Sequence, residues 1–125
     1  MEHRVRDAGG FVVPVHGVMR VNGELAVSRS FGDRGHAPCI VSAPEVVRRP
    51  IDPDRDRLVV VASDGLWSKV NSDLAASIAW KAYERSLEQN PGEHRLALKT
   101  AAVVLVKWAI RSGSSDNVAI AVCRI

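Results

Sequence analysis

Three aspartates stand where apolar runs give way to loops, and a carboxylate at such a place can bind a metal ion. Asp64 comes directly after the run 58–62 and one serine, Asp116 lies in the polar loop 113–117, and Asp33 follows a glycine. Without His or Cys nearby, these acids suit a hard cation, Mg²⁺ or Mn²⁺, better than Zn²⁺. Taken alone, Asp64 is better explained as a residue that caps the following loop, and Asp116 as a turn residue. Both interpretations stay open at this level.

The other motifs that could do chemistry are incomplete. The acidic run 52–56 resembles the start of a calcium-binding loop, but Arg57 stands where that loop needs Gly and Ser63 where it needs its closing Glu. A solvated turn is the better interpretation. The four histidines lack metal-ligand spacing, and no dinucleotide-binding, Walker or nucleophile-elbow motif is present. The sequence therefore predicts no protein nucleophile.

Composition describes an ordinary globular chain. It has 125 residues, 46% hydrophobic and 25% charged, with a formal net charge of +3. The basic residues are scattered and aromatic residues do not interleave with them, so we expect no nucleic-acid surface. The amino terminus lacks the apolar core of a signal peptide, and the most apolar stretch, 101–110, is too short to span a bilayer. Two widely spaced cysteines fit a reducing compartment. We expect no membrane partner and a cytoplasmic or nuclear location.

The elements that position these acids follow from hydrophobic periodicity and turn residues. We expect strands over 11–15 and 18–21, then a two-residue Asn22-Gly23 hairpin into a strand over 25–27. After this hairpin we expect a loop over 32–44 and a strand over 45–51. A charged turn over 52–57 then leads into a buried central strand over 58–62.

The second half of the chain predicts two consecutive amphipathic helices. The first carries an apolar stripe from Leu74 to Ala82 with Asn71 or Ser72 as its N-cap, and the second runs from near Glu93 to Gly113. A last strand is expected over 117–123, and a short helix over 1–8 at the start of the chain. The three tryptophans are expected in the core. This order favours an α+β fold over an alternating parallel one.

Four segments in the right order also resemble the metal-dependent protein serine/threonine phosphatases of the PPM, or type 2C, family. The segments that carry this resemblance are Ala8 to Val12 followed by Arg20 to Gly23, Leu25 to Asp33, Val61 to Trp67, and Gly113 to Val118. They are spread over nearly the whole chain and are jointly very specific. Residues 1–125 are therefore identified as a carboxy-terminal portion of such a domain.

The resemblance implies a four-layer αββα sandwich, incomplete in this chain, in which two antiparallel sheets are flanked by helices. It further implies two Mg²⁺ or Mn²⁺ ions per complete active site and hydrolysis of phosphoserine and phosphothreonine in proteins by a metal-activated water. By position, Asp64 and Asp116 match metal ligands. Asp33 matches an acid near the cleft, and Gly65 and Asn117 belong to the surroundings of the ligands. Phosphoprotein substrates are the implied partners.

The sequence departs from the family pattern in two respects. The amino-terminal half, with its Asp-Gly-His-Gly motif and further acidic ligand, is absent, and Ser68 stands where active members often carry another Asp. Two carboxylates hold a hard cation weakly, so we expect the isolated chain to be inactive. It would need the missing half of the domain or a self-association partner. The alternative is a catalytically inactive half-domain, or pseudophosphatase, that acts as a binding or regulatory module.

Overall fold

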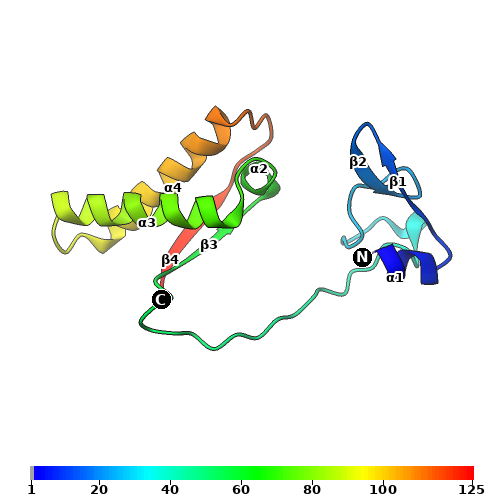
Figure 1. Cartoon of the computed structure of the whole chain (residues 1–125), viewed down its shortest axis with the longest axis horizontal. Helices are drawn as coiled ribbons and strands as arrows, with labels where there is room; N and C mark the ends of the chain where they lie inside the picture. Colours follow the sequence, from blue (N-terminus) through cyan, green and yellow to red (C-terminus); the bar gives the residue numbers. More distant parts are fainter. Residues whose placement is uncertain (1) are drawn as a thin grey trace. The chain divides into compact units, whose positions relative to one another are not determined.

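A computed structural model describes residues 2–125 and shows a mixed α+β fold with two antiparallel sheets and helices, as predicted (Figure 1). The chain forms two compact units. We call the one that ends at Arg49 the amino-terminal unit and the one from Pro50 to Ile125 the carboxy-terminal unit. Each contains one two-stranded sheet, and each is described by itself.

The amino-terminal unit is a small hairpin with a short helix. It contains helix α1 (Glu2–Asp7), strands β1 (Val12–Val15) and β2 (Val18–Val21), and the 3₁₀ helix η1 (Arg34–His36). The tight turn between β1 and β2 has positive φ at His16 and Gly17. A small core of Val5, Val21, Cys39 and Ile40 holds the unit together.

One sequence prediction fails beside this hairpin. No strand forms over 25–27; instead, residues 22–24 make a turn and Leu25 forms an isolated bridge with Val21. Asn22 and Gly23 do adopt the positive φ that their types favour, but the chain beyond them turns away. The expected loop 32–44 is confirmed, except that it contains η1.

The strand expected over 45–51 is also absent. This segment has no regular structure and leads from one unit to the next as an extended trace (Figure 1). Val46 and Val47 are 74% and 80% exposed, so its apolar residues have no burial within residues 2–125. β-branched residues such as Val46 and Val47 favour a strand only when a neighbouring strand pairs with them, and the described chain offers none here.

The carboxy-terminal unit packs helices on one face of an antiparallel pair. Strand β3 (Leu58–Ala62) pairs with β4 (Ile120–Arg124), with Val60 opposite Val122. Between them lie α2 (Asp64–Trp67), α3 (Ser72–Gln89) and α4 (His94–Arg111). The last strand thus begins three residues later than predicted, because the residues before Ile120 belong to the loop. The helix bounds agree closely with the prediction.

Small residues explain the close packing of α3 and α4. Both helices bury alanines along one stripe: Ala75 and Ala79 on α3, and Ala97, Ala101 and Ala109 on α4. Leu66 and Leu105 fill the centre of the same core.

The sheet uses its two faces differently. Leu58, Val60 and Ala62 pack against the helical core, whereas Val59 and Val61, which alternate with them, are 42% and 61% exposed. The tryptophan prediction was partly wrong, since Trp67 and Trp108 are about two-fifths exposed (38% and 40%). No helix in the described part of the chain is long and apolar enough to cross a membrane.

Candidate metal-binding loops

Asp64 owes its place to the end of strand β3. The strand stops at Ala62, Ser63 stays extended as the N-cap of α2, and Asp64 is the first residue of that short helix. Its carboxylate is exposed. An acid in the first helical turn is also favoured by the partial positive charge of the helix end.

Asp116 lies in the loop that follows α4. That helix ends at Arg111, and Gly113, with φ +84°, reverses the chain toward β4. One carboxylate oxygen of Asp116, Oδ1, accepts a hydrogen bond from the backbone N–H of Asn117 at 2.7 Å, which fixes the side chain in the loop. The residue is exposed, as Asp64 is.

Ser63 joins these two parts of the chain. Its Oγ donates to the carbonyl oxygen of Asn117 at 3.0 Å and accepts from the backbone N–H of Ala119 at 3.1 Å. Its own N–H donates to the carbonyl oxygen of Ala119 at 3.0 Å, which extends the β3–β4 ladder by one residue pair. Ser63, which directly precedes Asp64, is thus hydrogen-bonded to Asn117 and Ala119, two residues of the segment that follows Asp116.

A second hydroxyl and a glycine complete the junction. Ser114 Oγ donates to the carbonyl oxygen of Gly65 at 2.7 Å. A Cβ atom added at Gly65 would lie 2.3 Å from the carbonyl oxygen of Asn117, closer than such atoms can approach. The Asp64 loop (residues 63–65) and the Asp116 loop (residues 112–119) therefore lie directly against each other at one end of the sheet.

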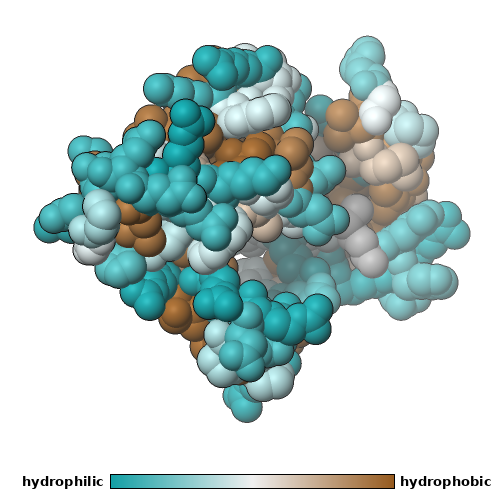
Figure 2. Space-filling view, turned by 60° about the vertical axis from the view of Figure 1, so that its left-hand side comes forward, coloured by the Kyte–Doolittle hydropathy of each residue, from teal (hydrophilic) through white to brown (hydrophobic). Residues whose placement is uncertain are grey.

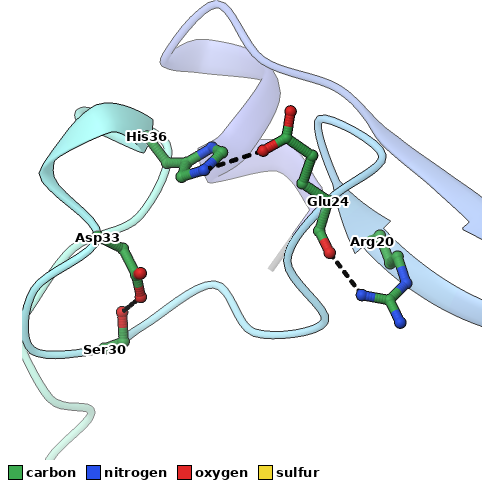
Figure 3. Close-up of polar contacts among 5 residues, drawn as sticks. All are labelled: Arg20, Glu24, Ser30, Asp33 and His36. Atoms are coloured by element: carbon green, nitrogen blue, oxygen red, sulfur yellow. Dashed lines mark hydrogen bonds and ion pairs between the residues drawn. The ribbon is translucent and has the colours of Figure 1, made fainter.

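Asp33 belongs to the amino-terminal unit, whereas Asp64 and Asp116 belong to the other unit. It has a left-handed backbone, with φ 48°, and its Oδ2 accepts a hydrogen bond from Ser30 Oγ at 2.6 Å (Figure 3). Nearby, His36 Nε2 lies 3.2 Å from a carboxylate oxygen of Glu24 (Figure 3). The backbone carbonyl oxygen of Glu24 accepts a hydrogen bond from the Arg20 guanidinium (Figure 3). In this unit Asp33 serves as a turn residue.

The donor chemistry of the two apposed loops fits a hard cation, because exposed carboxylate oxygens are the ligands that Mg²⁺ and Mn²⁺ prefer. Two carboxylates are, however, too few ligands to hold such a cation tightly. Within residues 2–125, no group of three or more His, Cys, Asp or Glu residues is placed to hold a metal ion. What the described chain offers a cation is two exposed carboxylates in loops that contact each other.

Sequence reasoning named Gly65 and Asn117 as surroundings of the ligands, and the structure brings them into contact. It missed Ser63 and Ser114, whose hydroxyls bind partners 54 and 49 residues away. The signal that could have found them is a serine directly before Asp64 and another two residues before Asp116, in two loops that adjacent strands bring together.

Comparison with known proteins gives the family of the chain. A family model described as protein phosphatase 2C matches residues 2–118. The chain is 35% identical over 122 residues to probable protein phosphatase 2C 32 of Oryza sativa subsp. japonica, and 38% identical over 128 residues to protein phosphatase 2C 7 of Arabidopsis thaliana.

These matches cover most of this chain but a small part of each relative. They span 98% and 95% of the chain against 29% and 24% of the two relatives. A solved structure titled "Structure of a C.elegans sex determining protein" superposes with a TM-score of 0.76 at 29% identity, over 98% of this chain and 28% of that one. The chain therefore spans under a third of the length of each of these three proteins.

Proposed function

Because the chain belongs to the protein phosphatase 2C family, we propose that residues 1–125 are the carboxy-terminal portion of a domain that hydrolyses phosphoserine and phosphothreonine in proteins. The observation that supports this most directly is the apposition of the Asp64 and Asp116 loops through Ser63, Ser114 and Gly65. Two acids from distant parts of the chain are thereby carried by one locally rigid structure.

In this proposal, Asp64 and Asp116 contribute carboxylate ligands to Mg²⁺ or Mn²⁺, two ions per complete site. When bound, such ions activate water for attack on phosphorus and offset charge on the phosphoryl oxygens. Gly65 and Asn117 hold the two loops at contact distance, and Asp33 belongs to the surroundings of the cleft. The ligands that residues 2–125 lack would come from an amino-terminal half, so the isolated chain is inactive.

The free edge of β3 is where we propose that this missing half adds. Hydrogen bonds from Ser63 N–H to Ala119 and from Ile125 N–H to Arg57 show that the odd-numbered residues of β3 bond to β4. In an antiparallel pair the alternate residues then point their backbone groups to the other side. Leu58 and Val60 therefore present N–H and C=O groups to an edge that no strand within residues 2–125 occupies.

The surroundings of this edge suit an added strand. The indole N–H of Trp67 bonds the carbonyl oxygen of Ala62 at 2.9 Å and so closes one end of the edge. A hollow of about 760 Å³ lies beside it, lined by Leu58, Val60, Trp67 and Trp80 among others. An extended apolar segment would pair with the backbone of β3 and place alternate side chains in this hollow.

The same edge favours the alternative function, a catalytically inactive half-domain that binds a partner or a second copy of itself. Unpaired strand edges and exposed apolar faces, such as that of Val59 and Val61, mark interaction surfaces in folded proteins. The two functions differ in whether the complemented protein hydrolyses a phosphoprotein.

The test is complementation. The part of the Arabidopsis thaliana relative that lies outside the matched region is fused to this chain, and the fusion is assayed with Mn²⁺ on a phosphothreonine peptide. We expect Mn²⁺-dependent hydrolysis that Asp64→Asn and Asp116→Asn each abolish, while Asp73→Asn, an exposed acid on α3, leaves it intact. A folded fusion without hydrolysis would favour the binding module, and hydrolysis unaffected by Asp64→Asn would refute the ligand assignment.

A further inference from the structure

A groove of about 730 Å³ runs between helices α3 and α4 of the carboxy-terminal unit. Its lining comes from these helices and the turn after α3: Leu74, Ser77, Ile78, Lys81, Ala82, Arg85, Ser86, Gln89, Asn90, Leu96, Thr100, Val104 and Trp108. None of these residues belongs to the Asp64 loop or the Asp116 loop. What the groove does can therefore be argued, and tested, independently of the proposed phosphatase function.

The floor of the groove is apolar and accessible. Leu74, Leu96 and Trp108 are each about two-fifths exposed (42%, 43% and 40%), and Ile78 and Val104 lie half-buried between them. In Figure 2, in which the helix pair comes forward, hydrophobic patches are visible between hydrophilic side chains. Large apolar side chains gathered in one groove, rather than scattered singly, indicate a binding surface.

The charge of the groove has one sign. Lys81 and Arg85, both exposed, are among its lining residues, and no acid is. The nearby acids of α3, Glu84 and Glu88, lie outside the lining. We propose that the α3–α4 groove binds an amphipathic helix of a partner protein, with acidic residues flanking the apolar stripe of that helix.

A helix fits this groove better than a strand does. Both long walls are α-helices, whose backbone N–H and C=O groups are bonded within the helix, so the groove has no strand edge to pair with. Recognition must then occur through side chains, and apolar residues at positions i, i+3, i+4 and i+7 of a helix form such a stripe. From Leu74 to Gln89 the groove extends roughly 22 Å, the length of about four helical turns.

The experiment uses the full 125-residue chain and two synthetic helical peptides of 18 residues. Both carry leucines at i, i+3, i+4 and i+7; one has Glu at the flanking positions and the other has Lys. Binding is followed by calorimetry and by the emission of Trp108, with Trp108→Phe to assign the signal. We expect the Glu peptide to bind about ten-fold more tightly than the Lys peptide, since two charge pairs form in one case and two repulsions in the other.

Charge reversal provides the control. Lys81→Glu with Arg85→Glu should invert the preference, whereas Arg95→Glu with Lys99→Glu, the same charge change on exposed residues of α4 outside the lining, should leave it as it was. Equal binding of both peptides, no binding, or no effect of the reversal would overturn the proposal.

Two other molecules could occupy the groove, and each would give a distinct result that overturns the proposal of a partner helix. If the chain alone forms a dimer by sedimentation, and the reversal at Lys81 and Arg85 abolishes it, the groove belongs to a second copy. If the chain binds phosphatidylserine-containing vesicles in preference to the Glu peptide, it belongs to an anionic lipid surface.

Discussion

The side-chain oxygen of Ser63 lies 3.0 Å from the carbonyl oxygen of Asn117, a residue 54 positions later in the chain. The same oxygen accepts the N–H of Ala119, so one hydroxyl is both donor and acceptor to the segment that leads from Asp116 into β4. Neighbouring Gly65 contacts the same carbonyl group. The relative position of the two candidate ligand loops is therefore fixed by contacts that involve neither carboxylate, and these contacts can be changed without touching the ligands.

The steric contact at Gly65 gives the first prediction. Gly65→Ala should destabilise the carboxy-terminal unit by about 1–3 kcal/mol, because the added Cβ would lie 2.3 Å from the carbonyl oxygen of Asn117. Gly65 is helical, where Ala is intrinsically preferred, so any loss is steric. Urea unfolding followed by tryptophan fluorescence measures it, since all three tryptophans lie in this unit. Gly92 has a positive φ and open space around an added Cβ, so Gly92→Ala measures the cost of backbone strain without a steric clash. A Gly65→Ala variant as stable as the parent would refute the contact.

The two hydroxyls give the second prediction. Ser63→Ala and Ser114→Ala should each lower the free energy of unfolding by about 1 kcal/mol, the usual net value of the lost hydrogen bonds. Both hydroxyls hold the same pair of loops. The free energy of unfolding lost in the double variant should therefore be smaller, by at least ~0.5 kcal/mol, than the sum of the losses in the two single variants. Ser115→Ala, in the same loop and exposed, serves as the matched control. Strict additivity would mean that the two hydroxyls act on separate structures.

Much of the fold could be predicted because its signals are local. The stripe from Leu74 to Ala82, with Asn71 or Ser72 as its N-cap, predicts α3, and the structure selects Asn71. The apolar run 58–62 predicts β3 at its exact bounds. The failures depend on pairing. The segments 25–27 and 45–51 contain the apolar and β-branched residues typical of strands, but a strand exists only where a partner meets its backbone, and local sequence does not carry that information.

For the candidate site, the sequence predicted the residue types and left the contacts out. Asp64 follows the apolar run 58–62, Asp116 lies in the polar loop before the last strand, and the family resemblance marks both as ligands. The structure brings their loops together through the β3–β4 pairing. Ser63 and Ser114 could not be assigned, because a serine within two residues of an acid is common in any turn. Their role depends on register across the sheet, which sets Ser63 opposite Ala119.

The cap of α3 gives the third prediction. Asn71 Oδ1 accepts the N–H of Leu74 at 2.9 Å, which satisfies a donor that the helix itself cannot. Asn71→Ala should cost about 1 kcal/mol in urea unfolding, and Asn71→Ser, which retains a capping oxygen, should cost much less. Equal losses for the two variants would show that the side-chain oxygen is not what stabilises this end of α3.

Metal binding gives the fourth prediction, and it separates the isolated chain from the complemented domain. With two exposed carboxylates and no third ligand placed near them within residues 2–125, the isolated chain should bind Mn²⁺ with a Kd on the order of 1 mM, typical of weak oxygen sites. Mn²⁺ titration followed by electron paramagnetic resonance measures this. The fusion with an amino-terminal half should bind at least about ten-fold more tightly, because further ligands are added. Asp64→Asn and Asp116→Asn should each remove most of that gain, and Asp73→Asn should not. Micromolar binding by the isolated chain that survives Asp64→Asn would place the metal elsewhere and leave the two apposed loops with a structural role.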